Sequence, residues 1–382
     1  MTLFPLTRPK AGLYMTADSI GVAHIHRRFG HQSFDDYEEQ PIPTGTIRLS
    51  PLEPNILEKE QVISNLKAVF GHRKGPRPIA LCLPDLCART TILEMASLPN
   101  SPKEQHALVE WRLQQDLKLS KEKRRISFQH LSQKSDRPVR LLATAIQENI
   151  IQAYENTCLE AGLIPASIHL ASLAVFNVCR PIMESILSQS KGRISFAPDT
   201  QFFLYLADWG FSLIGIRHKI PAFLRVKPLR YLSPWLPPIT QHQPEPDQEE
   251  TSRTDLNHEN FEKPAAADEP SNLHAFSPPT VDFLTNEIVG TLQYYFETYE
   301  KSFSPDEVYP LFLIGSHTPD QTLPKISELI EQEFPWEAGL GKPRIKAFPL
   351  FPGTPNVKPK SLTGLPTWTS TSLPAFSATS QT

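Results

Sequence analysis

The chain of 382 residues carries 38 basic and 41 acidic side chains, a net charge of −3, and 40% hydrophobic residues. This length suits two domains or one large bilobed fold, and the charge balance excludes a whole-protein field for gripping nucleic acid or an anionic membrane. The four cysteines lie in apolar contexts without zinc-site spacing, so we expect buried thiols, no disulfide framework and no metal site. The longest apolar run, 202–216, is too short to span a bilayer and contains Asp208, which predicts a cytosolic protein that meets membranes only through partners.

Two segments differ from the rest of the chain in composition. The 38 prolines are about twice the usual share of ~5% and cluster locally. Residues 237–280 are acidic and Pro-rich, and residues 349–382 are mostly Pro, Ser and Thr with isolated aromatics. Such sequences bury too little apolar area to offset the entropy of ordering. We therefore predict a disordered insertion and a disordered tail around a folded core.

Strands and helices alternate along that core, which predicts an α/β fold. Ser101, Pro102 and Glu104 combine an N-cap, a proline at the first helical position and an acidic third residue, so a helix should begin there. Another helix should stop at Gly162, a typical C-cap residue. The further expected elements are strands at 79–83, 91–95, 139–146 and 311–314, and helices through 150–158, at 281–299 and at 324–334.

Two hairpin patterns, about 190 residues apart, resemble each other. Leu13-Tyr14-Met15 matches Leu204-Tyr205-Leu206, and after a one-residue gap 20–25 matches 211–216, which aligns Asp18 with Asp208. Each copy reads as strand, polar turn, strand and basic exit. The separation is too large for a solenoid repeat, so we expect two related lobes that each open with a β-hairpin.

A series of short motifs links this duplicated pattern to a known family. The motifs are LEPNI at 52–56, the run at 79–94, Leu98-Pro99, VEWRLQQDL at 109–117, EAGLIP at 160–165, LASL at 170–173, EIVGTLQYY at 287–295 and FLIG at 312–315. In order and spacing the chain resembles the PilM family, actin-like cytoplasmic proteins of type IV pilus assembly. More distantly it resembles the cytoplasmic part of the type II secretion protein GspL.

The resemblance implies an actin-like fold, which is a duplicated, ribonuclease H-like α/β architecture of two lobes. The first lobe would span 1–180 and contain an inserted α/β subdomain at about 50–165. The second lobe would span 192–348, interrupted by the insertion 237–280 and followed by the tail 349–382.

The resemblance also locates a nucleotide site, which this sequence keeps only in part. The family's first hairpin carries an aspartate that organises the metal and a glycine that admits a phosphate; here Tyr14 and Thr16 stand in those places. Asp208-Trp209-Gly210 is a D-x-G remnant, which also suits an ordinary turn. The predicted vestigial site is Thr16, Ala17, Asp208, Gly210, Gly315 and Ser316, with no catalytic and no metal-binding residue. Binding of ATP with magnesium stays open, and efficient hydrolysis is not expected.

The resemblance and the altered site residues leave two candidate functions. No G-x-S-x-G, H-E-x-x-H or P-loop motif in the sequence supports another enzyme class. The first is a cytoplasmic scaffold, peripheral to the inner membrane, of a type IV pilus or related secretion machine. The resemblance implies that the N-terminal segment of a PilN-like bitopic inner-membrane protein docks between the first lobe and the inserted subdomain, and that the scaffold couples to the cytoplasmic motor ATPase. The alternative is an active ATPase or sugar-kinase-like enzyme, which would need Asp18 or Asp208 to replace the carboxylate missing at Tyr14.

Overall fold

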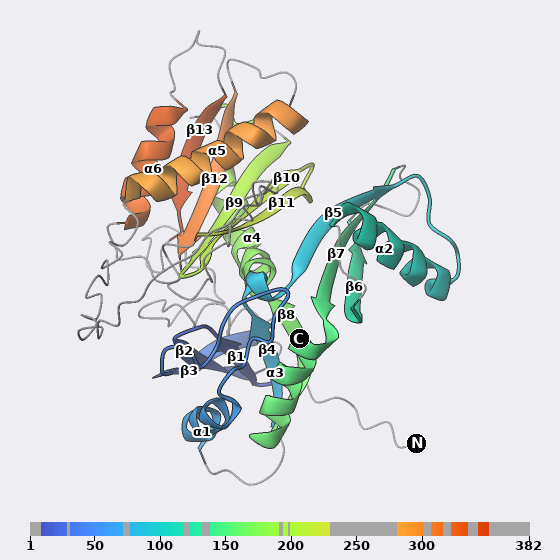
Figure 1. Cartoon of the computed structure of the whole chain (residues 1–382). Coiled ribbons are helices and arrows are strands. Elements are labelled where there is room, and N and C mark those ends of the chain that lie inside the picture. The colour runs from blue at the N-terminus through green and yellow to red at the C-terminus, as the bar shows by residue number, and fades with distance from the viewer. Residues whose placement is uncertain are drawn as a thin grey trace, which may run out of the picture.

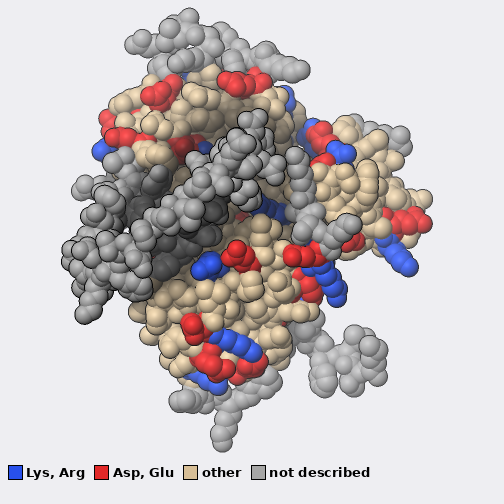
Figure 2. Space-filling model, viewed as in Figure 1, with Lys and Arg blue, Asp and Glu red and all other residues tan. Residues whose placement is uncertain are grey.

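The computed structural model describes residues 9–28, 31–71, 77–117, 122–131, 138–190, 194–197, 199–229, 281–300, 307–315, 322–334 and 343–350. The expected insertion 237–280 and the tail beyond residue 350 lie outside these ranges. No helix within the described ranges is long and apolar enough to cross a membrane. Figure 2 shows acidic and basic side chains interspersed over the face drawn, as the small net charge predicts.

The first lobe is a five-stranded sheet with helices packed against it (Figure 1). Its strands lie in the order β3-β2-β1-β4-β8, in which β1, β2 and β3 are antiparallel neighbours and β4 and β8 run parallel to β1. The elements are β1 (Ala11–Met15), β2 (Ser19–Arg28), β3 (His31–Pro41), α1 (Lys59–Phe70), β4 (Arg77–Leu83), α3 (Glu148–Glu160) and β8 (Leu163–Leu170).

The second lobe repeats this topology strand for strand. Its sheet has the order β11-β10-β9-β12-β13, again with three antiparallel strands followed by two parallel ones. The elements are β9 (Thr200–Ala207), β10 (Gly210–Arg217), β11 (Ile220–Pro228), α5 (Val281–Tyr299), β12 (Val308–Gly315), α6 (Thr322–Glu333) and β13 (Arg344–Pro349). The expected α/β architecture of two related lobes is therefore confirmed.

The strand register corrects one detail of the expected alignment. Met15 pairs with Ile20 in the first hairpin and Leu206 pairs with Phe211 in the second, so four residues separate the paired positions in both hairpins and the two copies align without a gap. Asp18 therefore corresponds to Trp209 and not to Asp208. Tyr14 and Tyr205 keep the equivalence that the sequence suggested.

A smaller unit interrupts the first lobe between β4 and α3. It consists of a three-stranded antiparallel sheet in the order β5-β7-β6, with one helix against it. Its elements are β5 (Arg89–Met95), α2 (Pro102–Asp116), β6 (Arg124–His130) and β7 (Val139–Gln147), and the short 3-10 helix η1 (Asp85–Cys87) leads into it. The expected subdomain at 50–165 is wider than this sheet, because β4 and β8 hydrogen-bond within the first lobe.

Helix α4 (Ala171–Gln189) connects the two lobes, and in Figure 1 it lies between their sheets. The expected lobe boundary at residue 180 falls inside this helix. A single apolar core surrounds α4 and includes the inward faces of both sheets, with the Phe176 and Phe203 rings 5.4 Å apart. The expected tail, 349–382, starts two residues too early: Pro349 ends β13, and the buried Leu350 donates its backbone N–H to Leu313 O (2.7 Å).

Candidate functional site

The turn of the first hairpin is closed by its own polar groups. Thr16 is only 1% exposed, and its Oγ1 accepts a hydrogen bond from Ser19 N (3.0 Å) and lies 2.6 Å from Asp18 Oδ1, to which it donates. The backbone N–H of Thr16 also donates to Ser19 O (2.9 Å), and Ala17 is buried beside it. The hydroxyl and the nearest carboxylate of this turn are thus engaged with each other.

The turn of the second hairpin faces the first across the junction of the lobes. Burial and then the negative charge of Asp18 on the other turn raise the pKa of Asp208 to about 7, against the opposing effect of backbone N–H groups that donate to the carboxylate. The structure therefore brings Asp208 near Asp18, although they are not equivalent in the duplication. Gly210 has φ +144°, and a Cβ there would collide with Lys227 O, so only glycine fits.

Two equivalent tyrosines lie beneath these turns. Tyr14 and Tyr205 are 1% and 0% exposed, and Trp209 is fully buried in the same apolar cluster. Burial raises the pKa of both phenols well above the usual range, and each is sensitive to the charge of Asp208. Tyr14 therefore stays neutral and supplies no fixed negative charge to the turn.

The remaining expected site residues are placed only in part. Gly315 ends β12 and pairs with Leu206 on the neighbouring strand β9, just before the turn that contains Asp208. Gly315 and Asp208 therefore lie at the same end of the strands of the second sheet. Ser316 lies outside the described residues. Nowhere in the described ranges do three or more His, Cys, Asp or Glu side chains group so that they could hold a metal ion, and the four cysteines are free thiols in buried positions.

A buried carboxylate lies near this site, and no pattern in the sequence indicated its role. Asp85, 2% exposed, accepts hydrogen bonds from Ser172 N (3.0 Å) and Ser172 Oγ. Asp85, in η1, thus caps the N-terminus of α4: it accepts a hydrogen bond from the Ser172 N–H, which has no acceptor within the helix. Burial raises the pKa of Asp85 to about 6 against these hydrogen bonds. A Pro-Asp turn after a buried strand was visible in the sequence, but its partner 87 residues later was not.

A groove of about 810 Å³ lies between the inserted subdomain and the first lobe. We call it the insert groove. One wall is β6 with part of β7, and the other is β8 with the first half of α4. Its apolar lining includes Phe128, Leu142, Ile146, Ile151, Ile168, Leu173 and Phe176.

Both walls of the insert groove present strand edges. Among the described strands, β8 pairs only with β4, and β6 pairs only with β7. Each therefore has a row of backbone donors and acceptors that no described strand uses. At one end of the groove Arg125 binds Glu148 (3.0 Å) and Glu155 (2.5 Å), and this ion-pair network ties β6 to α3.

Two lobes of the same five-stranded topology, joined by one helix and closed by facing hairpins, define an actin-like fold. Among solved structures, the chain is similar to a chain of a PilM-PilN type IV pilus biogenesis complex, with 15% identity, 99% of each chain covered and a TM-score of 0.63. A Bacteroides thetaiotaomicron protein with an actin-like ATPase fold and unknown function covers 91% of this chain and 94% of its own at 8% identity, with a TM-score of 0.42. No protein-family model and no curated protein sequence matches the chain.

Proposed function

We propose that this protein is an actin-like scaffold of a type IV pilus or related secretion machine, and that its insert groove binds the N-terminal segment of a PilN-like inner-membrane protein. The observation that carries the proposal is the groove itself, with an open strand edge on each side and an apolar floor. The fold shared with a chain of a PilM-PilN complex supports the same function.

An extended peptide fits this groove better than a compact ligand does. Strand edges bind a peptide through main-chain hydrogen bonds, and alternate side chains of the peptide enter apolar pockets. Phe128 on β6 and Ile168 on β8 line the two walls of the groove, so side chains from a single added strand could contact both walls. Such a segment would hold the protein at the cytoplasmic face of the inner membrane without a membrane span of its own, beside the motor ATPase.

We infer that the nucleotide site is degenerate. Magnesium-bound ATP needs a fixed carboxylate and a close backbone approach at the first hairpin. Tyr14 is neutral and buried there, and Thr16 and Asp18 hydrogen-bond to each other. The carboxylate of Asp208 gains a proton near neutral pH, which weakens it as a metal ligand. These residues do not fit magnesium-bound ATP, and the function proposed above needs no hydrolysis.

The test starts from the full chain, purified under native conditions from its own cells. We expect a single-pass membrane protein with a short cytoplasmic N-terminus to co-purify. A synthetic peptide of that N-terminus should bind the wild type, and Ala166→Arg, which places a long cation in the groove, should weaken binding at least about tenfold. Ala107→Arg, at an exposed position on α2, is the matched control and should leave binding unchanged.

Two results would contradict the proposal. One is the absence of any such partner together with magnesium-dependent nucleotide binding and turnover, measured by calorimetry and phosphate release. The other is an Ala166→Arg protein that binds the peptide as tightly as the control.

A further inference from the structure

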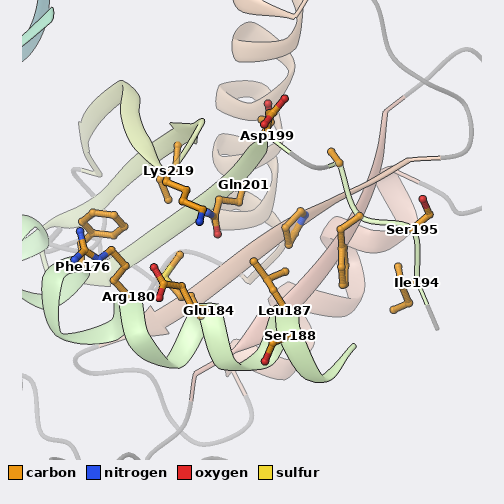
Figure 3. A pocket seen from close by; sticks show the side chains of 16 residues that line it. Phe176, Arg180, Glu184, Leu187, Ser188, Ile194, Ser195, Asp199, Gln201 and Lys219 are labelled. Atoms are coloured by element: carbon orange, nitrogen blue, oxygen red, sulfur yellow. The ribbon is translucent and has the colours of Figure 1, made fainter. Parts of the chain in front are cut away.

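A second pocket, of about 820 Å³, lies along the C-terminal half of α4 (Figure 3). We call it the α4 pocket. It is lined by α4, by the segment that leads into β9, and by residues of the central strands β9, β10 and β12 of the second sheet. The insert groove instead lies between the first lobe and the inserted subdomain. Met183 and Ile216 form part of its buried apolar floor, at 1% and 2% exposure.

The α4 pocket and the insert groove are continuous. Phe176, Arg180 and Lys219 line both of them, and Figure 3 shows these three side chains together at one end of the α4 pocket. A ligand that follows α4 can therefore pass from the first lobe to the second without leaving the protein surface.

Two cations without carboxylate partners stand at this junction. Arg180 and Lys219 are both exposed. Within the described part of the chain, no carboxylate oxygen lies within 4.0 Å of a side-chain nitrogen of either residue. Of the acidic groups that line the α4 pocket, Asp199 binds His218 (3.0 Å), and Glu184 lies one turn beyond Arg180 on the same face of α4. The junction thus offers positive charge to an incoming group.

The backbone that carries Lys219 is held in an unfavourable conformation. His218 and Lys219 form the two-residue turn between β10 and β11, with φ of +51° and +65°. Such turns favour Asn-Gly because both residues need positive φ. A lysine kept in this conformation points to a role for its side chain, since strained residues concentrate at binding sites.

A buried acceptor inside the α4 pocket has no partner. Gln201 lines the pocket, and its Oε1 is inaccessible to solvent and makes no hydrogen bond with any described residue. A backbone N–H of a bound peptide would satisfy it. The pocket therefore combines buried apolar side chains, a buried acceptor without a described partner and a cationic entrance, which together suit a peptide better than a small apolar molecule.

We propose that the docked segment of the membrane partner does not end in the insert groove but continues along α4 into the α4 pocket. At the junction it places an acidic residue between Arg180 and Lys219, and beyond the junction it places apolar side chains against the second lobe. This inference rests on the proposed function and deepens it, because one partner segment would then contact both lobes.

Site-specific cross-linking of the full chain tests the path of the segment. p-Benzoylphenylalanine is introduced at Ser127 in the insert groove, at Ser188 in the α4 pocket, or at Ala107 as the remote control. We expect cross-links from Ser127 and Ser188 to two different stretches of the same single-pass membrane protein, identified by mass spectrometry, and none from Ala107.

The outcomes separate this inference from the proposed function. If Ser127 cross-links the membrane protein and Ser188 does not, the extended path is wrong and the scaffold function stands. If Ser188 cross-links residues 351–382 of its own chain, the chain's tail occupies the α4 pocket and the inference is overturned. If neither position reaches a single-pass membrane protein, both proposals fail.

The cations are tested by binding of the partner's synthetic segment to the full chain. Arg180→Glu combined with Lys219→Glu should weaken binding about tenfold and reduce its dependence on salt. Arg112→Glu, a single charge reversal on α2, is the control for each of the single variants Arg180→Glu and Lys219→Glu and should not weaken binding.

Lys219→Gly separates binding from structural damage. Glycine relieves the positive φ, so the variant should have a higher Tm than the wild type and still bind more weakly. A Lys219→Gly protein that is more stable and binds with unchanged affinity would overturn the assigned role of Lys219.

Discussion

The pH dependence of stability should change when Asp208 loses its charge. In the folded protein the pKa of Asp208 is raised to about 7 from an ordinary value of 3.8, mainly by burial and then by the charge of Asp18. Between these pH values the folded protein holds a proton that the unfolded chain has released. The contribution of Asp208 to stability is therefore full below about pH 4 and is lost as the pH rises to about 7.

The size of the effect follows from the two pKa values. Their difference corresponds to at most about 4 kcal/mol. Because the side chain keeps partial contact with water, we expect about 2 kcal/mol. Asp208→Asn should thus match the wild type near pH 4 and exceed its free energy of unfolding by about 2 kcal/mol at pH 8.

Urea unfolding followed by tryptophan fluorescence at several pH values measures this difference, since Trp209 is fully buried beside the substitution. Asp85, whose pKa is also raised, contributes equally to both proteins and cancels in the comparison. Asp18→Asn should produce a smaller gain at pH 8, because burial is the larger cause of the shift. If wild type and Asp208→Asn lose the same stability between pH 4 and 8, burial does not raise the pKa of Asp208 as described.

Further variants test the packing around the site. Gly210→Ala should lower the free energy of unfolding by more than about 2 kcal/mol, because the added Cβ would collide with Lys227 O. Gly290→Ala, on the exposed face of α5, should instead raise it by about 0.5 to 1 kcal/mol. Urea unfolding measures both changes. Asn55 is fully buried and bonds Cys87 Sγ (3.0 Å), so Asn55→Ala should cost about 2 kcal/mol, and the exposed Asn100→Ala should change stability by less than about 0.5 kcal/mol. The four buried thiols should react with a thiol reagent only after unfolding, which a colorimetric assay in native buffer checks.

Local signals in the sequence were enough to predict many elements. The helix expected at 281–299 has those bounds in the structure, because its apolar stripe continues to both ends, and Gly162 ends α3 with φ +80°, as a C-cap glycine should. The duplicated hairpins were recognisable because equivalent strands bury equivalent residues. The topology shared by the two lobes then follows from the same pattern.

Features that depend on distant pairing were not predictable in the same way. The bounds of the inserted subdomain depend on which strands β4 and β8 join, and no local pattern contains that information. The cap that Asp85 places on α4 and the junction of Arg180 with Lys219 each join segments far apart in the chain. Asp18 and Asp208 were paired by alignment for the wrong reason, since the two lobes bring them together although the duplication does not relate them.

The common core around α4 has a practical consequence for anyone who divides this protein. The inward face of the second sheet contributes Phe203, Tyr205 and Ile314 to the same apolar cluster as the first lobe. Expressed alone, each lobe would expose to water its own apolar residues of this shared cluster and would tend to aggregate. The two lobes, although each repeats the same topology, thus share one apolar core and constitute one folding unit. We expect that truncations or domain insertions between the lobes would disrupt this core.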